Sequence, residues 1–156
     1  MPPELEAECA ANFGVSLASD DPEMRGMARR LNATLRQYTA TLAKRDVYVA
    51  AAEQFFESWD VLLCPVTVGP AFPHCPTGTP ITVDGRDVPY RLAGTGYTSP
   101  FNLTGNPAVV VPLARSAEDL PIGIQLVGRR WSEMELLAIA ERFMQVIGPF
   151  QRPPGY

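Results

Sequence analysis

The side chains best suited to covalent chemistry in this chain are few, and two of them are neighbours in the sequence. The single histidine, His74, precedes Cys75 in the stretch Pro-His-Cys-Pro. A Cys–His dyad needs two side chains that face one another, and adjacent residues rarely do so. A rigid loop is the simpler interpretation. A cysteine-dependent enzyme that uses this pair stays open as a hypothesis.

Serines, metal ligands and the only lysine show no catalytic arrangement either. A Ser-His-Asp hydrolase of the nucleophile-elbow type has its serine in a Gly-x-Ser-x-Gly turn, and no serine here has that context. Zinc sites use paired ligands such as Cys-x-x-Cys, a spacing that Cys64, His74 and Cys75 lack. Lys44 falls on a predicted helix, where a solvated surface position is expected. We therefore predict no catalytic residue, metal or cofactor in the chain.

Apolar residues that recur every three or four positions predict two helices. Asp21 followed by Pro22 is typical of a helix start, and we expect one long helix over about residues 22–58, which would break, if anywhere, near Arg45 and Asp46. A shorter helix should begin at the capping-box pattern of Ser132 and Glu135 and end at Gly148 and Pro149.

Short apolar runs between turn residues predict strands. They lie at 61–64, at 81–83 and 86–88 around an Asp84-Gly85 turn, and at 108–113 and 122–127. The last two are expected to pair in antiparallel fashion because their connection is short. The stretches 65–80 and 93–100 are expected to be loops. The unbroken apolar run at 61–64 predicts burial on both faces.

The composition indicates one domain-sized piece with a substantial core. The chain has 156 residues, of which 46% are hydrophobic, and a net charge of -4 with scattered basic residues. That charge pattern favours neither nucleic acid nor an anionic membrane as a partner. No apolar run approaches a membrane span of about 18 residues, and the first residues do not resemble a signal peptide. Three cysteines, an odd number, fit a reducing compartment, so a cytoplasmic location is expected.

The expected elements do not add up to a self-contained domain. Three core strands would have only two helices to cover them, which would leave exposed sheet edges and an apolar face. A solitary soluble domain normally avoids such a surface. We therefore expect an α/β piece of a larger structure.

Three phrases, in this order and spacing, carry a resemblance to a known family. They are "WDVLLCPVTVGPAF", "TSPFNLTGNPAVVVPLA" and "LPIGIQLVGRRWSEMELLAIAERF", at residues 59–72, 98–114 and 120–143. Together with a lead-in at Arg45, Phe55 and Phe56, they resemble the carboxy-terminal third of amidase signature enzymes over residues 38–147.

The resemblance implies part of the mixed β-sheet core of an amidase-signature fold, in an enzyme that cuts carboxamides to acid and ammonia or amine. Such enzymes use a serine activated by a second serine on a cis peptide and by a lysine. This sequence has no Ser-Ser pair, so no catalytic residue carries over. By resemblance, the loops at 65–80 and 94–102 help to wall the substrate funnel, and the candidate pocket-wall residues are Tyr97, Thr98, Phe101 and Asn102. Turn formation and core packing remain alternative roles for this stretch.

These observations lead to a division of the chain and to two main functional hypotheses. We predict an arm or short helix at 1–20, the carboxy-terminal part of an amidase domain at 21–150, and a tail at 151–156. The first hypothesis is a fragment of an amidase that is inactive alone, whose partner is the missing amino-terminal portion or a second copy and whose parent acts on a small amide. The alternative is a non-catalytic module that docks a partner chain or dimerises.

Overall fold

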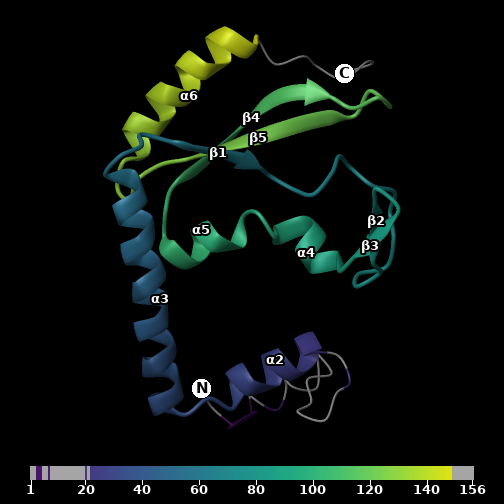
Figure 1. The fold of residues 1–156 in the computed structure, drawn as a ribbon. Helices are drawn as coiled ribbons and strands as arrows, with labels where there is room; N and C mark the ends of the chain where they lie inside the picture. Colours follow the sequence, from purple (N-terminus) through teal and green to yellow (C-terminus); the bar gives the residue numbers. More distant parts are fainter. Residues whose placement is uncertain (1–2, 5–6, 8–19, 21, 149–156) are drawn as a thin grey trace. The chain divides into compact units, whose positions relative to one another are not determined.

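The computed structural model describes residues 3–4, 7, 20 and 22–148 (Figure 1). The chain divides into two compact units, Met1–Lys44 and Arg45–Tyr156, with the boundary inside a helix. Most of the predicted arm, together with Asp21, Pro149 and the predicted tail, lies outside the described residues. None of the described helices is long and apolar enough to cross a membrane.

The predicted long helix is wrong, because two helices occupy its place. Helix α2 spans Pro22–Leu31, and α3 spans Leu35–Phe56 without a break at Arg45 and Asp46. A capping box starts α3: the Gln37 N–H donates to Thr34 Oγ1 at 3.3 Å, and the Thr34 N–H donates to Gln37 Oε1 at 2.8 Å. The Asn32 side-chain amide donates to the Ala28 carbonyl at 2.8 Å at the end of α2.

The second unit is built on a three-stranded antiparallel sheet. Strand β5 (Pro121–Val127) lies in the centre between β1 (Leu62–Pro65) and β4 (Ala108–Arg115). Leu126 is in register with Leu63 on one side and with Val109 on the other. The three predicted core strands and the antiparallel pairing of the last two are thus confirmed, with ends shifted by up to two residues.

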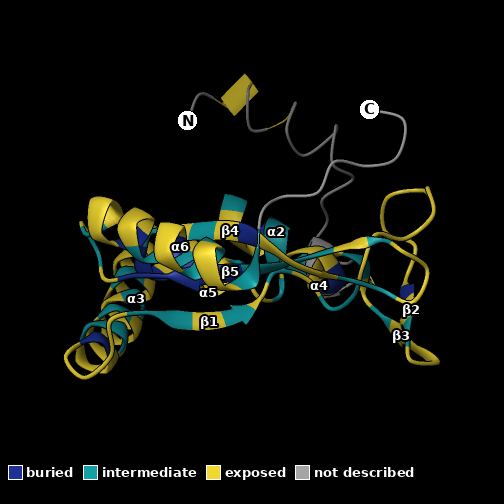
Figure 2. Ribbon diagram, turned by 90° about the horizontal axis from the view of Figure 1, so that it is seen from above, coloured by how far each residue is buried: buried dark blue, intermediate teal, exposed yellow. Residues whose placement is uncertain are grey.

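Helices lie on both sides of this sheet (Figure 1). Helix α6 (Glu133–Ile147) packs on the face that carries Val111 and Leu126, where its Leu136 and Ala140 complete the buried core. Figure 2 shows this buried layer between the strands and the exposed outer turns of α6. The start and end of α6 agree with the prediction, but its capping box does not form, because Ser132 Oγ donates to the Arg129 carbonyl at 2.7 Å.

Two short helices, α4 (Tyr90–Thr95) and α5 (Ser99–Thr104), lie on the opposite face of the sheet. The prediction of a loop over 93–100 is therefore wrong. Helical bonds form despite the glycines: the Ala93 N–H donates to the Pro89 carbonyl at 2.9 Å, and the Gly96 N–H donates to the Leu92 carbonyl at 3.0 Å. Pro100 is in the first turn of α5, where its missing N–H costs no hydrogen bond.

A separate hairpin joins β2 (Ile81–Val83) and β3 (Arg86–Val88). The turn residues Asp84 and Gly85 have φ angles of 50° and 74°, the left-handed region that a tight hairpin of this type requires. This predicted hairpin is confirmed with the predicted bounds.

The outer strands of the described sheet leave apolar side chains uncovered. Leu63 on β1 is 44% exposed and Val110 on β4 is 54% exposed. The prediction that the 61–64 run is buried on both faces is wrong, because β1 is an edge strand with alternating half-buried and exposed residues. The expected exposed edges and apolar surface are confirmed for the described part of the chain.

Candidate substrate-pocket wall

The motif Thr-Gly-Asn-Pro fixes the end of α5 to the end of β5. Gly105 has a φ of 76° and ends the helix. The buried Asn106 side chain accepts a hydrogen bond from Thr104 Oγ1 at 2.6 Å and donates to the Gly128 carbonyl at 2.9 Å. The Gly128 N–H returns a bond to the Pro107 carbonyl at 3.0 Å. These polar groups therefore position the segment before β4 and have a structural role.

A second buried amide, Gln125 on the central strand, ties two loops to the sheet. Its Nε2 donates to the Pro65 carbonyl at 2.7 Å and to the Tyr97 carbonyl at 3.0 Å. Burial raises the pKa of the neighbouring Cys64 thiol, and a hydrogen bond with Gln125 partly offsets that rise. The Cys64 thiol is therefore a poor candidate for a nucleophile.

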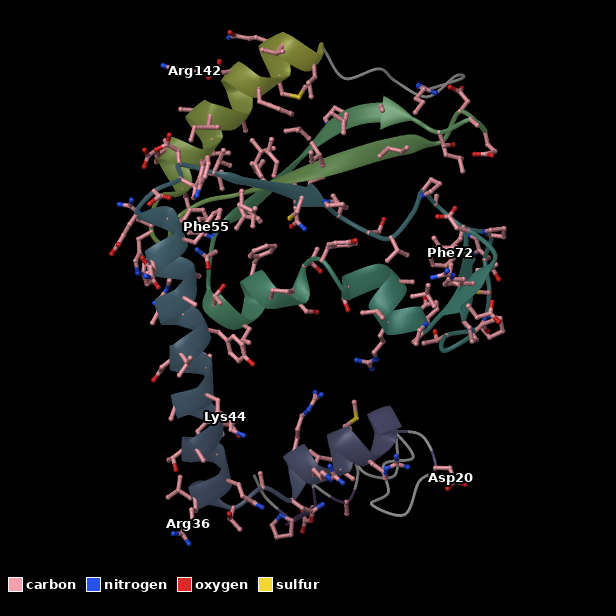
Figure 3. The ribbon with its side chains drawn as sticks, viewed as in Figure 1. Asp20, Arg36, Lys44, Phe55, Phe72 and Arg142 are labelled. Atoms are coloured by element: carbon pink, nitrogen blue, oxygen red, sulfur yellow. The ribbon has the colours of Figure 1, made fainter. Side chains whose placement is uncertain are left out.

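Arg129 fixes the carboxy-terminal end of α3. Its Nη2 donates to the Phe56 carbonyl at 2.8 Å, and a cation is favourable at that end of a helix. Phe56 is buried, and the ring of Phe55 meets it edge-on at a centroid distance of 5.1 Å. Figure 3 shows Phe55 at this end of α3.

Two cavities lie within the second unit, and the larger one is bordered by α4 and α5. The larger, of about 700 Å³, is mainly apolar, and its walls include Tyr48 and Ala52 of α3, Leu62 of β1, Leu92 of α4 and Phe101 of α5. The smaller, of about 440 Å³, lies between the loop at 65–71 and Tyr97, with Val110 and Gly123 of the sheet beside them.

The four predicted pocket-wall residues do not converge on one cavity. Phe101 lines the larger cavity and Tyr97 lines the smaller one. Thr98 precedes α5, where its carbonyl accepts bonds from the Phe101 and Asn102 N–H groups, and Asn102 is exposed. Neither Thr98 nor Asn102 lines these two cavities. Their role toward a substrate stays a prediction.

Sequence patterns did not identify the polar residues that organise this region. In the sequence, Gln125 and Asn106 are only parts of a motif, and Arg129 resembles ordinary soluble surface. The signal that could have found Gln125 is a lone amide inside the apolar strand Ile-Gln-Leu-Val, since a buried amide without partners is costly.

The His74–Cys75 pair and Lys44 show no catalytic geometry in the part of the chain that the structure describes. His74 is exposed and Cys75 is half-buried. Lys44 is exposed on α3 (Figure 3). Among the described residues, no group of three or more His, Cys, Asp or Glu side chains could hold a metal ion.

Comparison with known proteins assigns the chain to a family. The sequence model described as Amidase matches residues 17–137, well over half of the chain. The chain belongs to the amidase family. The amidase-signature resemblance carried by the three phrases is thus confirmed.

Relatives and a solved structure agree with the amidase assignment. "Putative amidase AmiD" of Mycobacterium bovis is 33% identical over 136 residues, which are 85% of this chain and 27% of that protein. "Fatty acid amide hydrolase" of Medicago truncatula is 31% identical over 121 residues, which are 78% of this chain and 20% of that protein. A crystal structure of an amidase, 24% identical, has the same fold with a TM-score of 0.67 over 93% of this chain and 32% of that chain. The chain therefore spans about a quarter or less of the length of these two curated relatives.

Proposed function

We propose that this chain is the carboxy-terminal portion of an amidase that hydrolyses the C–N bond of a small carboxamide, giving an acid and ammonia or an amine. The observation that carries the proposal is the similarity in fold to a solved amidase over 93% of this chain but only 32% of that enzyme. The uncovered edge strands β1 and β4 support a missing remainder, because exposed apolar strands are normally covered. That remainder is the expected partner.

The chain by itself is proposed to be catalytically inert. A serine becomes a nucleophile only when a base takes its proton, and the sequence contains no Ser-Ser pair or equivalent relay. The described hydroxyls of Ser116 and Ser132 donate to Glu118 Oε2 and to the Arg129 carbonyl, which are local turn contacts.

The odd number of cysteines, three, supports a reducing compartment, so we propose a cytoplasmic location for the protein.

An amide-hydrolysis assay on the purified chain tests this proposal. Acetamide and benzamide are incubated with the 156-residue protein, and released ammonia is measured. We expect the purified chain to release ammonia no faster than a mock preparation made from cells that lack the gene. Turnover that co-purifies with the chain and disappears with a serine-directed inhibitor would show that a complete relay exists in these residues, against the proposal.

A second candidate function, a non-catalytic docking module, is favoured by one surface. Trp131, Met134 and Leu137 lie at the start of α6 and are all more than half exposed. Analytical ultracentrifugation tests this second candidate. A stable, folded monomer would count against a docking surface that needs cover, whereas a dimer with retained structure would support it.

A further inference from the structure

We propose that Gln125 is a positioning residue that holds the two walls of the smaller cavity at a fixed separation. One wall is the loop at 65–71, and the other is Tyr97. The proposal rests on the proposed function and on the expectation, from the family resemblance, that the loops at 65–80 and 94–102 help to wall the substrate funnel. It gives a role to Gly123 and Gln125, the Gly-x-Gln part of the phrase "LPIGIQLVG".

The hydrogen bonds of Gln125 join three distant parts of the chain. The residue is 1% exposed on the central strand, and its single side-chain nitrogen bonds the carbonyls of Pro65 and Tyr97. An amide nitrogen carries two hydrogens, so it can donate to both carbonyls at once. The bonds reach 60 residues back to one wall and 28 residues back to the other.

The surroundings make packing alone an insufficient reason for a glutamine here. The next two residues of β5, Leu126 and Val127, are both 0% exposed and apolar. A buried amide costs free energy unless its polar atoms are bonded, and an apolar residue of similar volume would fill the same space. The amide at position 125 is therefore explained by the two carbonyls that it holds.

Gly123 contributes to the same arrangement, because it shares a sheet face with Gln125 two residues away. A Cβ atom at position 123 would lie 3.0 Å from Val110 Cγ1 and 3.7 Å from Val66 Cγ2. Glycine thus leaves room for side chains that line the cavity, while Gln125 holds the loops. A bond from the Val68 N–H to the Ala93 carbonyl, at 3.4 Å, is a longer second link between the same regions.

The test uses two substitutions and a matched control in the full chain. Gln125→Met keeps the approximate volume and removes both donors. Gln125→Glu keeps the shape, but its carboxylate repels the two carbonyls at pH 7 and regains one O–H donor when it is protonated at low pH. Gln145→Met, at an exposed glutamine of α6, is the control. Amide hydrogen exchange is followed in peptides that cover 65–71 and 95–99, with α6 as the internal reference.

Both Gln125 variants should exchange about tenfold faster than the natural chain in the two loops at pH 7, with little change in α6. Lowering the pH should restore part of the protection for Gln125→Glu but none for Gln125→Met, relative to the natural chain at the same pH, because a protonated glutamate has one donor for the two carbonyls. Loop exchange in Gln125→Met equal to that of the control would overturn the proposal, as would the lack of any pH-dependent recovery.

A measurement on the natural chain covers the case in which the variants do not fold. The side-chain amide protons of Gln125, observed by NMR, should exchange with solvent at least about tenfold more slowly than those of Gln145. Equal rates would overturn the proposal. None of these readouts involves amide hydrolysis, so their failure is distinct from a failure of the proposed function.

Discussion

Replacing Asn106 by alanine should destabilise the second unit far more than the same change at Asn102. The Asn106 side chain supplies the donor to the buried Gly128 carbonyl at 2.9 Å, and alanine leaves that carbonyl without it. A buried acceptor that loses its donor costs about 1–3 kcal/mol. The hydroxyl of Thr104 also donates to the Pro100 carbonyl at 3.1 Å, so the loss of its bond to Asn106 adds little to that cost.

Urea unfolding followed by circular dichroism measures the effect. With a slope of about 2 kcal/mol per M, a loss of about 2 kcal/mol lowers the urea midpoint by about 1 M. Asn102→Ala is the matched control, because Asn102 is exposed one turn earlier on α5, and its effect should stay within about 0.5 kcal/mol. Equal midpoints for the two variants would refute the view that Asn106 fixes α5 to the sheet.

Three further predictions follow from burial, backbone conformation and thiol environment. Leu126→Ala should cost about 2–5 kcal/mol in urea unfolding because Leu126 is fully buried, whereas Leu137→Ala on the exposed side of α6 should change stability little. Gly105→Ala should cost about 1 kcal/mol of stability, because the φ of 76° at Gly105 disfavours a side chain. Gly69→Ala, at a glycine without a positive φ, should cost less, and equal thermal midpoints for the two variants would contradict this. Burial raises the pKa of the Cys64 thiol, so iodoacetamide at pH 8 should modify Cys64 more slowly in the native chain than in urea. Peptide mapping measures the two rates, and equal rates would contradict this prediction. The same experiment tests the cysteine-enzyme hypothesis, which an ordinary alkylation rate at Cys75 would dispose of.

Elements with strong local signals were predictable from the sequence. The Asp84-Gly85 turn specifies the β2–β3 hairpin, and the apolar spacing of Leu136 and Ala140 identifies the buried face of α6. The family could also be predicted, since three separated phrases together are specific. For the hairpin and the helix, the residues that decide the structure lie within a few positions of one another.

Other features depended on competing or distant interactions. The break before α3 comes from Thr34 and Gln37, a capping pair that a continuous apolar stripe concealed. Helices α4 and α5 form in a stretch where glycines favoured a loop, because local backbone bonds and Pro100 outweigh glycine's conformational freedom. The bonds of Gln125 join residues up to 60 positions apart, a pairing that no local pattern contains.

We propose that this chain is part of an amidase whose serine relay lies outside these 156 residues. Sequencing the DNA immediately upstream of the codon for Met1 tests it most directly. We expect a coding segment there, either in frame or as a separate gene, that contains the Ser-Ser pair and the lysine of the family's relay. An upstream region that encodes neither would contradict the claim.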